Sequence, residues 1–219
     1  PSEVPVFETL ARFTKKHGVT FVINTEAFRQ VGIANIKELR PTFDATELRG
    51  QTMRRYLNVA LEGLGATYLV KNGVIEVVPV GHAAVVTKAA LVESDGDGRP
   101  RLKEPLVSVV LKEKPLNEVV AKLAEMYDLN VILSSQVGEA KTARVTARLL
   151  NVPADKAIEV LAIQCELRMV RKGTVFLIAS KDQANELLNE KREQERRQIE
   201  LEQLRAAPAA PPKPPEPKM

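Results

Sequence analysis

The stretch "LAIQCELRMVRKGTVFLIAS" (residues 161–180) reads as the end of an apolar helix, a strand, a short turn and a second strand. About a hundred residues earlier, "ALEGLGATYLVKNGVIEVVPV" (60–80) follows the same succession. The predicted turn of the later stretch is Lys172-Gly173, and glycine adopts the positive φ of a tight hairpin at little cost. The sequence therefore predicts a helix-to-hairpin unit that is built twice.

Residues upstream of 161 predict the rest of the later unit. The β-branched run at 106–112 predicts a strand, "NVILS" (130–134) a second, and "TARVTARLLN" (142–151) a third that alternates between a buried and a wet side. Two helices separate these strands, each opened by a proline, Pro115 or Pro153. Their apolar faces contain Leu116, Val119, Val120, Leu123 and Tyr127 in the first helix and Ala154, Ala157, Ile158, Leu161, Ala162 and Cys165 in the second.

The predicted order over residues 106–180 is β-α-β-β-α-β-β, with two helices on one face of a small mixed sheet, which is an α+β fold. The first unit, residues 1–80, aligns with the second at an offset of 110 near its start and 101 near its end. The nine-residue difference falls around residues 26–41. The first unit begins too late to contain the first strand, and its central strand, expected in "TFDATELRG" (42–50), needs a β-bulge to alternate.

The remaining segments have different compositions. Residues 81–105 contain "SDGDGRP" and predict a linker with a turn or hairpin. Residues 181–206 mix acidic and basic residues with few apolar ones, which predicts a charged helix. Residues 207–219 are proline-rich and predict an extended tail that forms no core.

Overall composition indicates a folded protein, with 44% apolar and 27% charged residues. No apolar run is long enough to span a bilayer, and the first twenty residues lack a signal-peptide pattern. Because the sequence begins at Pro1, this end does not indicate a compartment.

Candidate catalytic and metal-binding residues do not form a recognisable motif. Cys165 lies on the apolar face of its helix, so we interpret it as a small core residue. His17 and His82 lack metal-ligand spacing, and Asp95 with Asp97 lack the later ligands of a calcium loop. We therefore expect no catalytic residues, no metal and no cofactor, and interpret the chain as a non-enzyme.

An alternative role in nucleic-acid binding rests on four arginines of the second unit, Arg144, Arg148, Arg168 and Arg171. The first two share a face of their predicted strand. The formal charge of +4 is spread thinly, however, because residues 1–80 and 107–180 each hold ten basic and eight acidic residues. Only 4% of residues are aromatic, and a GxxG loop is missing, so the alternative ranks second.

The sequence resembles a known family in both units. The matching stretches are "PLNEVVAKLAEMYDLNVILSSQVG" (115–138) and 143–180 in the second unit, with "GVTFVIN" (18–24) and 48–70 in the first. They resemble the short N-terminal (STN) domain that bacterial secretins and TonB-dependent receptors share. The resemblance implies two tandem STN-like repeats with no catalytic residues.

The same resemblance implies a periplasmic or cell-envelope protein that binds partner proteins or assembles with itself. Small sheets have exposed edges, and an exposed strand can accept another strand from a partner. We therefore expect a protein partner or self-association through the sheet edges.

Overall fold

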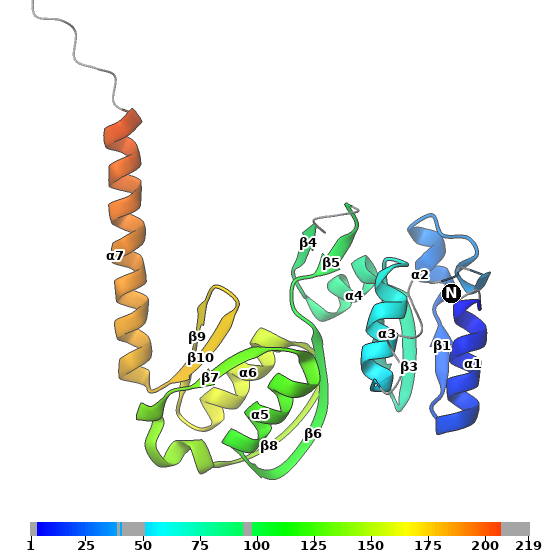
Figure 1. Cartoon of the computed structure of the whole chain (residues 1–219), viewed down its shortest axis with the longest axis horizontal. Coiled ribbons are helices and arrows are strands. Elements are labelled where there is room, and N and C mark those ends of the chain that lie inside the picture. The colour runs from blue at the N-terminus through cyan, green and yellow to red at the C-terminus, as the bar shows by residue number, and fades with distance from the viewer. Residues whose placement is uncertain (1–3, 39, 41–50, 94–97, 207–219) are drawn as a thin grey trace, which may run out of the picture.

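The computed structural model describes residues 4–38, 40, 51–93 and 98–206. Within these residues the α+β prediction is confirmed: helices pack on small mixed sheets, and a helix lies near the C-terminus (Figure 1). The predicted proline-rich tail, residues 207–219, lies outside the described residues.

The second unit has the predicted order of elements. Its strands and helices are β6 (Leu106–Pro115), α5 (Leu116–Tyr127), β7 (Asn130–Leu133), β8 (Arg144–Pro153), α6 (Ala154–Gln164), β9 (Arg168–Lys172) and β10 (Val175–Ala179). A short 3-10 segment, η2 (Ser135–Thr142), connects β7 to β8. Every apolar residue predicted on the two helix faces is buried. The prolines cap the helices from outside, since Pro115 and Pro153 are the residues before the first turns.

The strands of this unit divide between two sheets instead of forming one. Strands β7, β10 and β9 make a three-stranded sheet in that order, whereas β6 pairs only with β8. Helices α5 and α6 lie between the two sheets (Figure 1). One core joins Val107 and Val145 of the two-stranded sheet to Phe176 and Ile178 of the other. The helices therefore bury apolar surface on two sides, which a single sheet would not provide.

The closing hairpin differs from the prediction by one residue. Lys172 pairs with Val175, so the loop consists of Gly173 and Thr174. Gly173 has a φ of 59°, as expected for a tight turn. In the first unit the corresponding loop is Asn72-Gly73, where both residues have positive φ.

The first unit repeats the three-stranded sheet. It contains α1 (Val6–His17), β1 (Phe21–Ile23), α2 (Thr25–Gln30), a 3-10 turn η1 (Ile36–Glu38), α3 (Met53–Glu62), β2 (Ala66–Lys71) and β3 (Val74–Pro79). Strand β1 is parallel to β3 and β2 is antiparallel to it, as β7 and β9 are to β10. The strand predicted at 42–50 lies outside the described residues. Elements α2 and η1 fall where the extra residues were predicted.

The segment between the units is more ordered than a linker. Helix α4 (Val80–Thr87) follows directly from β3, and strands β4 (Leu91–Glu93) and β5 (Pro100–Leu102) form a hairpin. Periodicity did not predict α4, because this helix buries only Val80, Ala83 and Ala84 and leaves Val85 81% exposed. Ala83 contacts Leu69 and Val78 of the first sheet, and Leu106 of β6 packs against the same cluster. The connection thus helps to join the two units.

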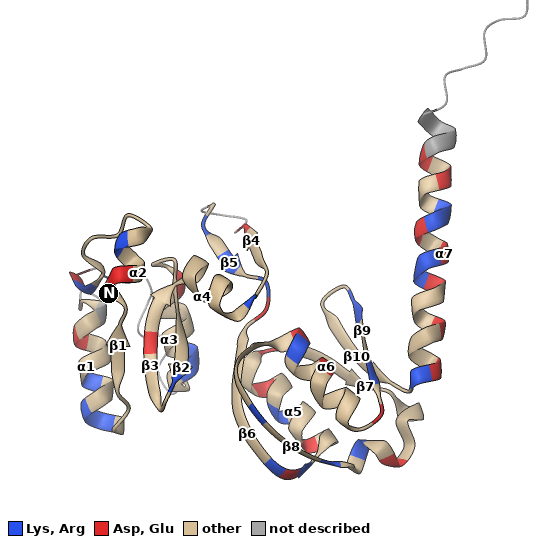
Figure 2. Cartoon of the chain, turned by 180° about the vertical axis from the view of Figure 1, so that it is seen from behind, with Lys and Arg blue, Asp and Glu red and all other residues tan. Residues whose placement is uncertain are grey.

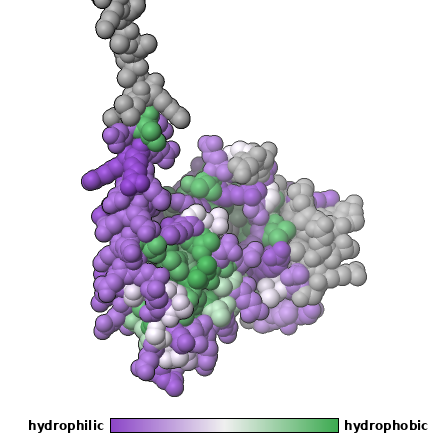
Figure 3. All heavy atoms as spheres, turned by 60° about the vertical axis from the view of Figure 1, so that its left-hand side comes forward, coloured by the Kyte–Doolittle hydropathy of each residue, from purple (hydrophilic) through white to green (hydrophobic). Residues whose placement is uncertain are grey.

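Helix α7 (Lys181–Ala206) is charged along its length, as predicted. Lys and Arg alternate with Asp and Glu along it (Figure 2), and the side of α7 seen in Figure 3 is mostly hydrophilic, although Leu188, Ile199 and Leu201 are also exposed. Near its start, Ala184 is buried and the Ser134 hydroxyl donates a hydrogen bond to Gln183 Oε1 at 2.7 Å. Beyond that contact α7 extends away from the sheets (Figure 1). Among the helices of the described residues, none has the length and apolar character to cross a bilayer.

Candidate interaction surface

Two β-bulges shape the β6–β8 sheet. Between the pairs Val107–Val152 and Val109–Leu149, strand β8 has one residue more than β6, and Asn151 there has a φ of 54°. Further along, β6 has the extra residue, and Glu113 has a φ of 49°. Bulges bend the strand that carries them and change the direction of its side chains. They separate a regular segment of β6 from its two ends.

The side chain of Tyr127, the last residue of α5, reveals which backbone groups of β6 face away from β8. Its hydroxyl accepts a hydrogen bond from Ser108 N at 2.7 Å and donates one to Ser108 O at 3.2 Å. Consecutive residues of a strand direct their backbone groups to opposite sides, so those of Val110 point to the same outer side as Ser108. The sheet has no third strand among the described residues, and the backbone of Val110 is therefore available to one.

A groove runs between this outer edge of β6 and helix α5. Its volume is about 420 Å³, and it is lined by Val109, Val110, Leu111, Lys112, Lys114, Glu118, Val119 and Lys122. We call it the β6–α5 groove. Val119 and Leu111 belong to the core, while Val110 is 59% exposed. The floor is therefore apolar, and the charged side chains lie around it.

The far end of the groove is held by hydrogen bonds around the second bulge. Arg144 Nη1 donates to the carbonyl oxygen of Glu113 at 2.8 Å, and the Thr146 hydroxyl donates to Glu113 Oε1 at 2.8 Å. The Glu113 N–H in turn donates to Thr146 Oγ1 at 3.0 Å. These bonds hold a glutamate in a conformation that non-glycine residues seldom adopt.

Asn151 joins the two units. Its amide Nδ2 donates to the carbonyl oxygen of Val70 at 2.8 Å, and its Oδ1 accepts from the Val70 N–H at 2.7 Å. Val70 lies in β2, which is an edge strand of the first sheet. The side-chain amide thus provides the same donor and acceptor that a neighbouring strand would provide. This edge of the first sheet is occupied at Val70.

Arg54 of α3 makes a second contact between the units. Its guanidinium lies over the ring of Tyr127, 3.9 Å from the centroid, a cation–π arrangement. A cleft of about 280 Å³ surrounds this contact and is lined by residues of both units, including Tyr68, Ser108, Val109 and Val110. Burial raises the pKa of Tyr68 above its ordinary value, although the nearby Arg54 charge opposes the effect. The cleft and the β6–α5 groove share Val109 and Val110, so they are adjacent along β6.

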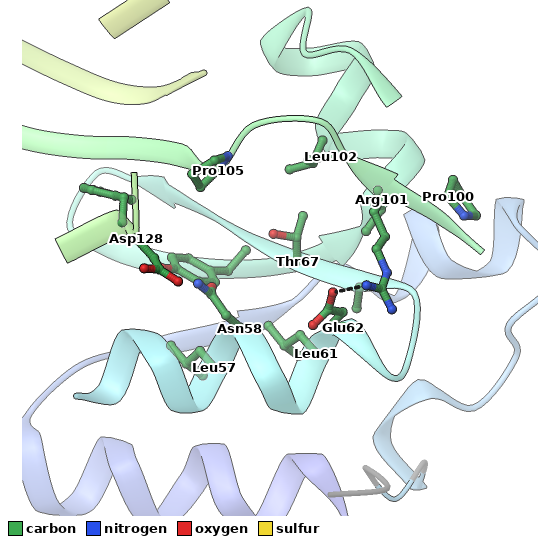
Figure 4. A pocket seen from close by; sticks show the side chains of 14 residues that line it. Leu57, Asn58, Leu61, Glu62, Thr67, Pro100, Arg101, Leu102, Pro105 and Asp128 are labelled. Atoms are coloured by element: carbon green, nitrogen blue, oxygen red, sulfur yellow. Dashed lines mark ion pairs between the residues drawn. The ribbon is translucent and has the colours of Figure 1, made fainter. Parts of the chain in front are cut away.

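A third cavity, of about 360 Å³, lies between α3, the β4–β5 hairpin and the end of α5 (Figure 4). An ion pair between Arg101 and Glu62, at 3.0 Å, lies at one end, and Asp128 lies at the other (Figure 4). The described lining contains no serine, cysteine or histidine. The side chains that point into this cavity therefore include no pairing of a nucleophile with a histidine base.

The four arginines of the nucleic-acid alternative lie on two different sheets. Arg144 and Arg148 lie on β8, where Arg144 is bonded to Glu113 and Arg148 is exposed. Arg168 and Arg171 lie on β9, in the sheet on the other side of the helices. Arg171 forms an ion pair with Glu104, which is buried, and stacks over Phe176. The structure places two of these arginines on each sheet and does not unite all four.

The other candidate residues are also placed. Cys165 is buried in the core of the second unit, and burial raises the pKa of its thiol. His17 ends α1, with its ring 5.9 Å from that of Phe13, and His82 lies in α4. Asp95 and Asp97 lie outside the described residues. No group of three or more potential metal ligands occurs within the part of the chain that the structure describes.

Sequence reasoning did not predict the β6–α5 groove. Val110 and Lys112 were part of a predicted strand, and Tyr127 was predicted only as a core residue. The hydroxyl of Tyr127 gave one available signal, because a buried tyrosine normally finds a hydrogen-bond partner. The bulge at Glu113 gave none, since glutamate does not favour a positive φ.

Comparisons with known proteins add little. No family model matches the chain, and none of the curated proteins matches it. Among solved structures, the chain is similar to a protein from Parabacteroides distasonis described as a candidate anti-sigma factor, with 9% identity and a TM-score of 0.31. That alignment covers 53% of this chain and 55% of the other, so the chain spans about half the length of that protein. A likeness of this size carries no argument about function.

Proposed function

We propose that this chain is a non-enzymatic protein-interaction module of the bacterial cell envelope, and that it binds its partner by accepting a strand at the outer edge of β6. The cell-envelope setting rests on the STN-like sequence pattern of both units. The observation that carries the proposal is the outward-facing backbone of Val110 beside an apolar groove. Edge strands with a neighbouring groove bind extended segments through main-chain hydrogen bonds, and the groove selects side chains.

Side chains cover the strand edges at two comparable positions, whereas the edge at Val110 is left open. At Val70 the edge of β2 is occupied by the Asn151 amide, and at Ser108 the edge of β6 is occupied by the Tyr127 hydroxyl. Proteins commonly cover or charge exposed strand edges, because such edges pair with other chains. Val110 is apolar and exposed, so it has the character of an edge that pairs with a partner.

A single substitution tests this proposal. Val110→Pro removes an N–H that faces away from β8, and proline is tolerated at such edge positions. We expect immobilised wild-type protein to retain a specific envelope protein from an extract of its source bacterium, and Val110→Pro to retain at least tenfold less. Val110→Thr is the matched control, because it keeps the N–H and the strand propensity.

Circular dichroism and thermal unfolding establish that both variants are folded before they are compared. If Val110→Pro is folded and still retains the same protein as Val110→Thr, the outer edge of β6 is not the interaction site.

A further inference from the structure

The β6–α5 groove has a charge bias as well as an apolar floor. Three lysines, Lys112, Lys114 and Lys122, line it, against the single carboxylate of Glu118. All three lysines are exposed. Within the described part of the chain, none of them takes part in an ion pair. Their charges are thus available to a bound molecule.

The pleat of β6 determines how a bound strand would present its side chains. Val109 and Leu111 face the core side of the sheet, toward α5, whereas Val110 and Lys112 face the opposite side. A strand added beside Val110 would alternate in the same way. Side chains on its core side would contact the apolar floor at Val119, and side chains on its other face would lie beside Lys112.

We propose that the β6–α5 groove binds an extended acidic segment of a partner protein, in which apolar residues alternate with aspartate or glutamate. The apolar residues contact Val109, Leu111 and Val119, and the carboxylates on the other face lie beside Lys112. This inference rests on the proposed function, because it assumes strand addition at β6. It adds the chemical character of the partner.

The charges also decide between this occupant and a second copy of the chain. A second copy pairing through its own β6 would bring a second set of the same three lysines to the same edge, and like charges at close range oppose association. Arg54, in the adjacent cleft, adds a further positive charge at the other end of this edge. An acidic segment is therefore the complementary partner.

The test uses fluorescence anisotropy with the full chain and three labelled eight-residue peptides, blocked at both ends. In these peptides valine alternates with glutamate, with glutamine or with lysine. We expect the glutamate peptide to bind at least tenfold more tightly than the lysine peptide, with the glutamine peptide between them. Affinity for the glutamate peptide should fall as salt is raised, because exposed charge pairs are screened.

Substitutions then locate the site. Lys112→Gln should weaken binding of the glutamate peptide by about two- to fivefold, as expected for an exposed charge pair. Lys16→Gln, at an exposed lysine of α1, is the matched control and should leave affinity unchanged. Val110→Pro should abolish binding of the glutamate and glutamine peptides alike. An unlabelled oligothymidine should fail to displace the glutamate peptide.

Each outcome has a defined meaning. Equal binding of the glutamate and glutamine peptides, lost in Val110→Pro, overturns the acidic preference and leaves strand addition intact. Retention of the envelope partner in a Val110-dependent manner, without binding of the glutamate peptide, likewise overturns only the inference made here. Binding of the glutamate peptide that Val110→Pro does not affect overturns the site. Displacement by oligothymidine would show a general anion site in place of a peptide groove.

Discussion

Asn151→Gly removes one of the contacts between the two units without straining the backbone. Asn151 has a φ of 54°, a conformation that glycine adopts without strain and alanine does not. Asn151→Gly therefore removes the side-chain amide without a backbone penalty. The loss comprises the bonds of 2.7 and 2.8 Å to the N–H and the carbonyl oxygen of Val70, and a bond of 3.3 Å from the Ser108 hydroxyl to Asn151 Oδ1. A typical intramolecular hydrogen bond contributes about 0.5–1.5 kcal/mol, so the two bonds to Val70 together contribute about 1–3 kcal/mol.

Native-state hydrogen exchange at Val70 is the most direct measurement of this loss. In the wild-type protein the Val70 N–H is protected by Asn151 although β2 is an edge strand. In Asn151→Gly we expect exchange at Val70 to accelerate by about one to two orders of magnitude, the factor that corresponds to the lost free energy. The amide of Ile178, in the central strand β10 of the second unit, is the internal reference and should change little.

Urea unfolding provides the second measurement. We expect the first unit of Asn151→Gly to unfold at a lower urea concentration than that of the wild type, because it loses a contact with the second unit. The m-value should stay unchanged. Asn151→Ala adds the cost of a positive φ and should be less stable than Asn151→Gly by about 1 kcal/mol. If Val70 exchanges at the wild-type rate in both variants, the amide bridge does not protect this edge and the reasoning about covered edges is wrong.

Two further predictions concern ionisable groups. The hydrogen bond from the Lys71 ammonium, followed by that from Asn24 Nδ2, holds the pKa of Glu76 below its ordinary value. The folded pKa lies below the unfolded one, so this contribution to stability is complete above the unfolded pKa and is lost as pH falls through the folded pKa. Urea midpoints between pH 7 and pH 3 should fall less steeply in Glu76→Gln than in wild type, and parallel curves would contradict the assignment. Burial raises the pKa of the Cys165 thiol, so a thiol dye at pH 8 should label native protein at least tenfold more slowly than protein in urea; equal rates would contradict its burial.

The sequence predicted the individual helices and strands better than it predicted which of them pack together. Helical periodicity placed the buried faces of α5 and α6 correctly because both helices bury wide apolar stripes. Alternation correctly predicted a buried and a wet side of β8, where Val145 and Leu149 are buried, but it gave no information on which strand or helix they would contact. The division into two sheets therefore could not be predicted. Helix α4 was missed because its buried residues are small and its exposed residues include valines.

The β6–α5 groove depends on features with weak or absent sequence signals. Asn151 gave a usable signal, since asparagine tolerates a positive φ, whereas Glu113 did not. The basic character of the groove comes from lysines on β6 and α5 that become neighbours only after folding. In the same way, the four arginines of the nucleic-acid alternative lie on two sheets with helices between them. Proximity in sequence was a poor guide to proximity on the surface.

The short length of the open edge limits how tightly it can bind. Ser108 is already bonded to Tyr127, and the second bulge begins after Leu111, so Val110 is the outward-facing position of the regular segment between them. A partner strand would therefore form only a few backbone hydrogen bonds here, each contributing about 1 kcal/mol. Tight binding requires further contacts, and the β6–α5 groove and the adjacent cleft at Arg54 are the surfaces that continue from this edge. Because that cleft is lined by both units, the contacts of Asn151 and Arg54 that join the units also determine how much of the surface a partner can reach.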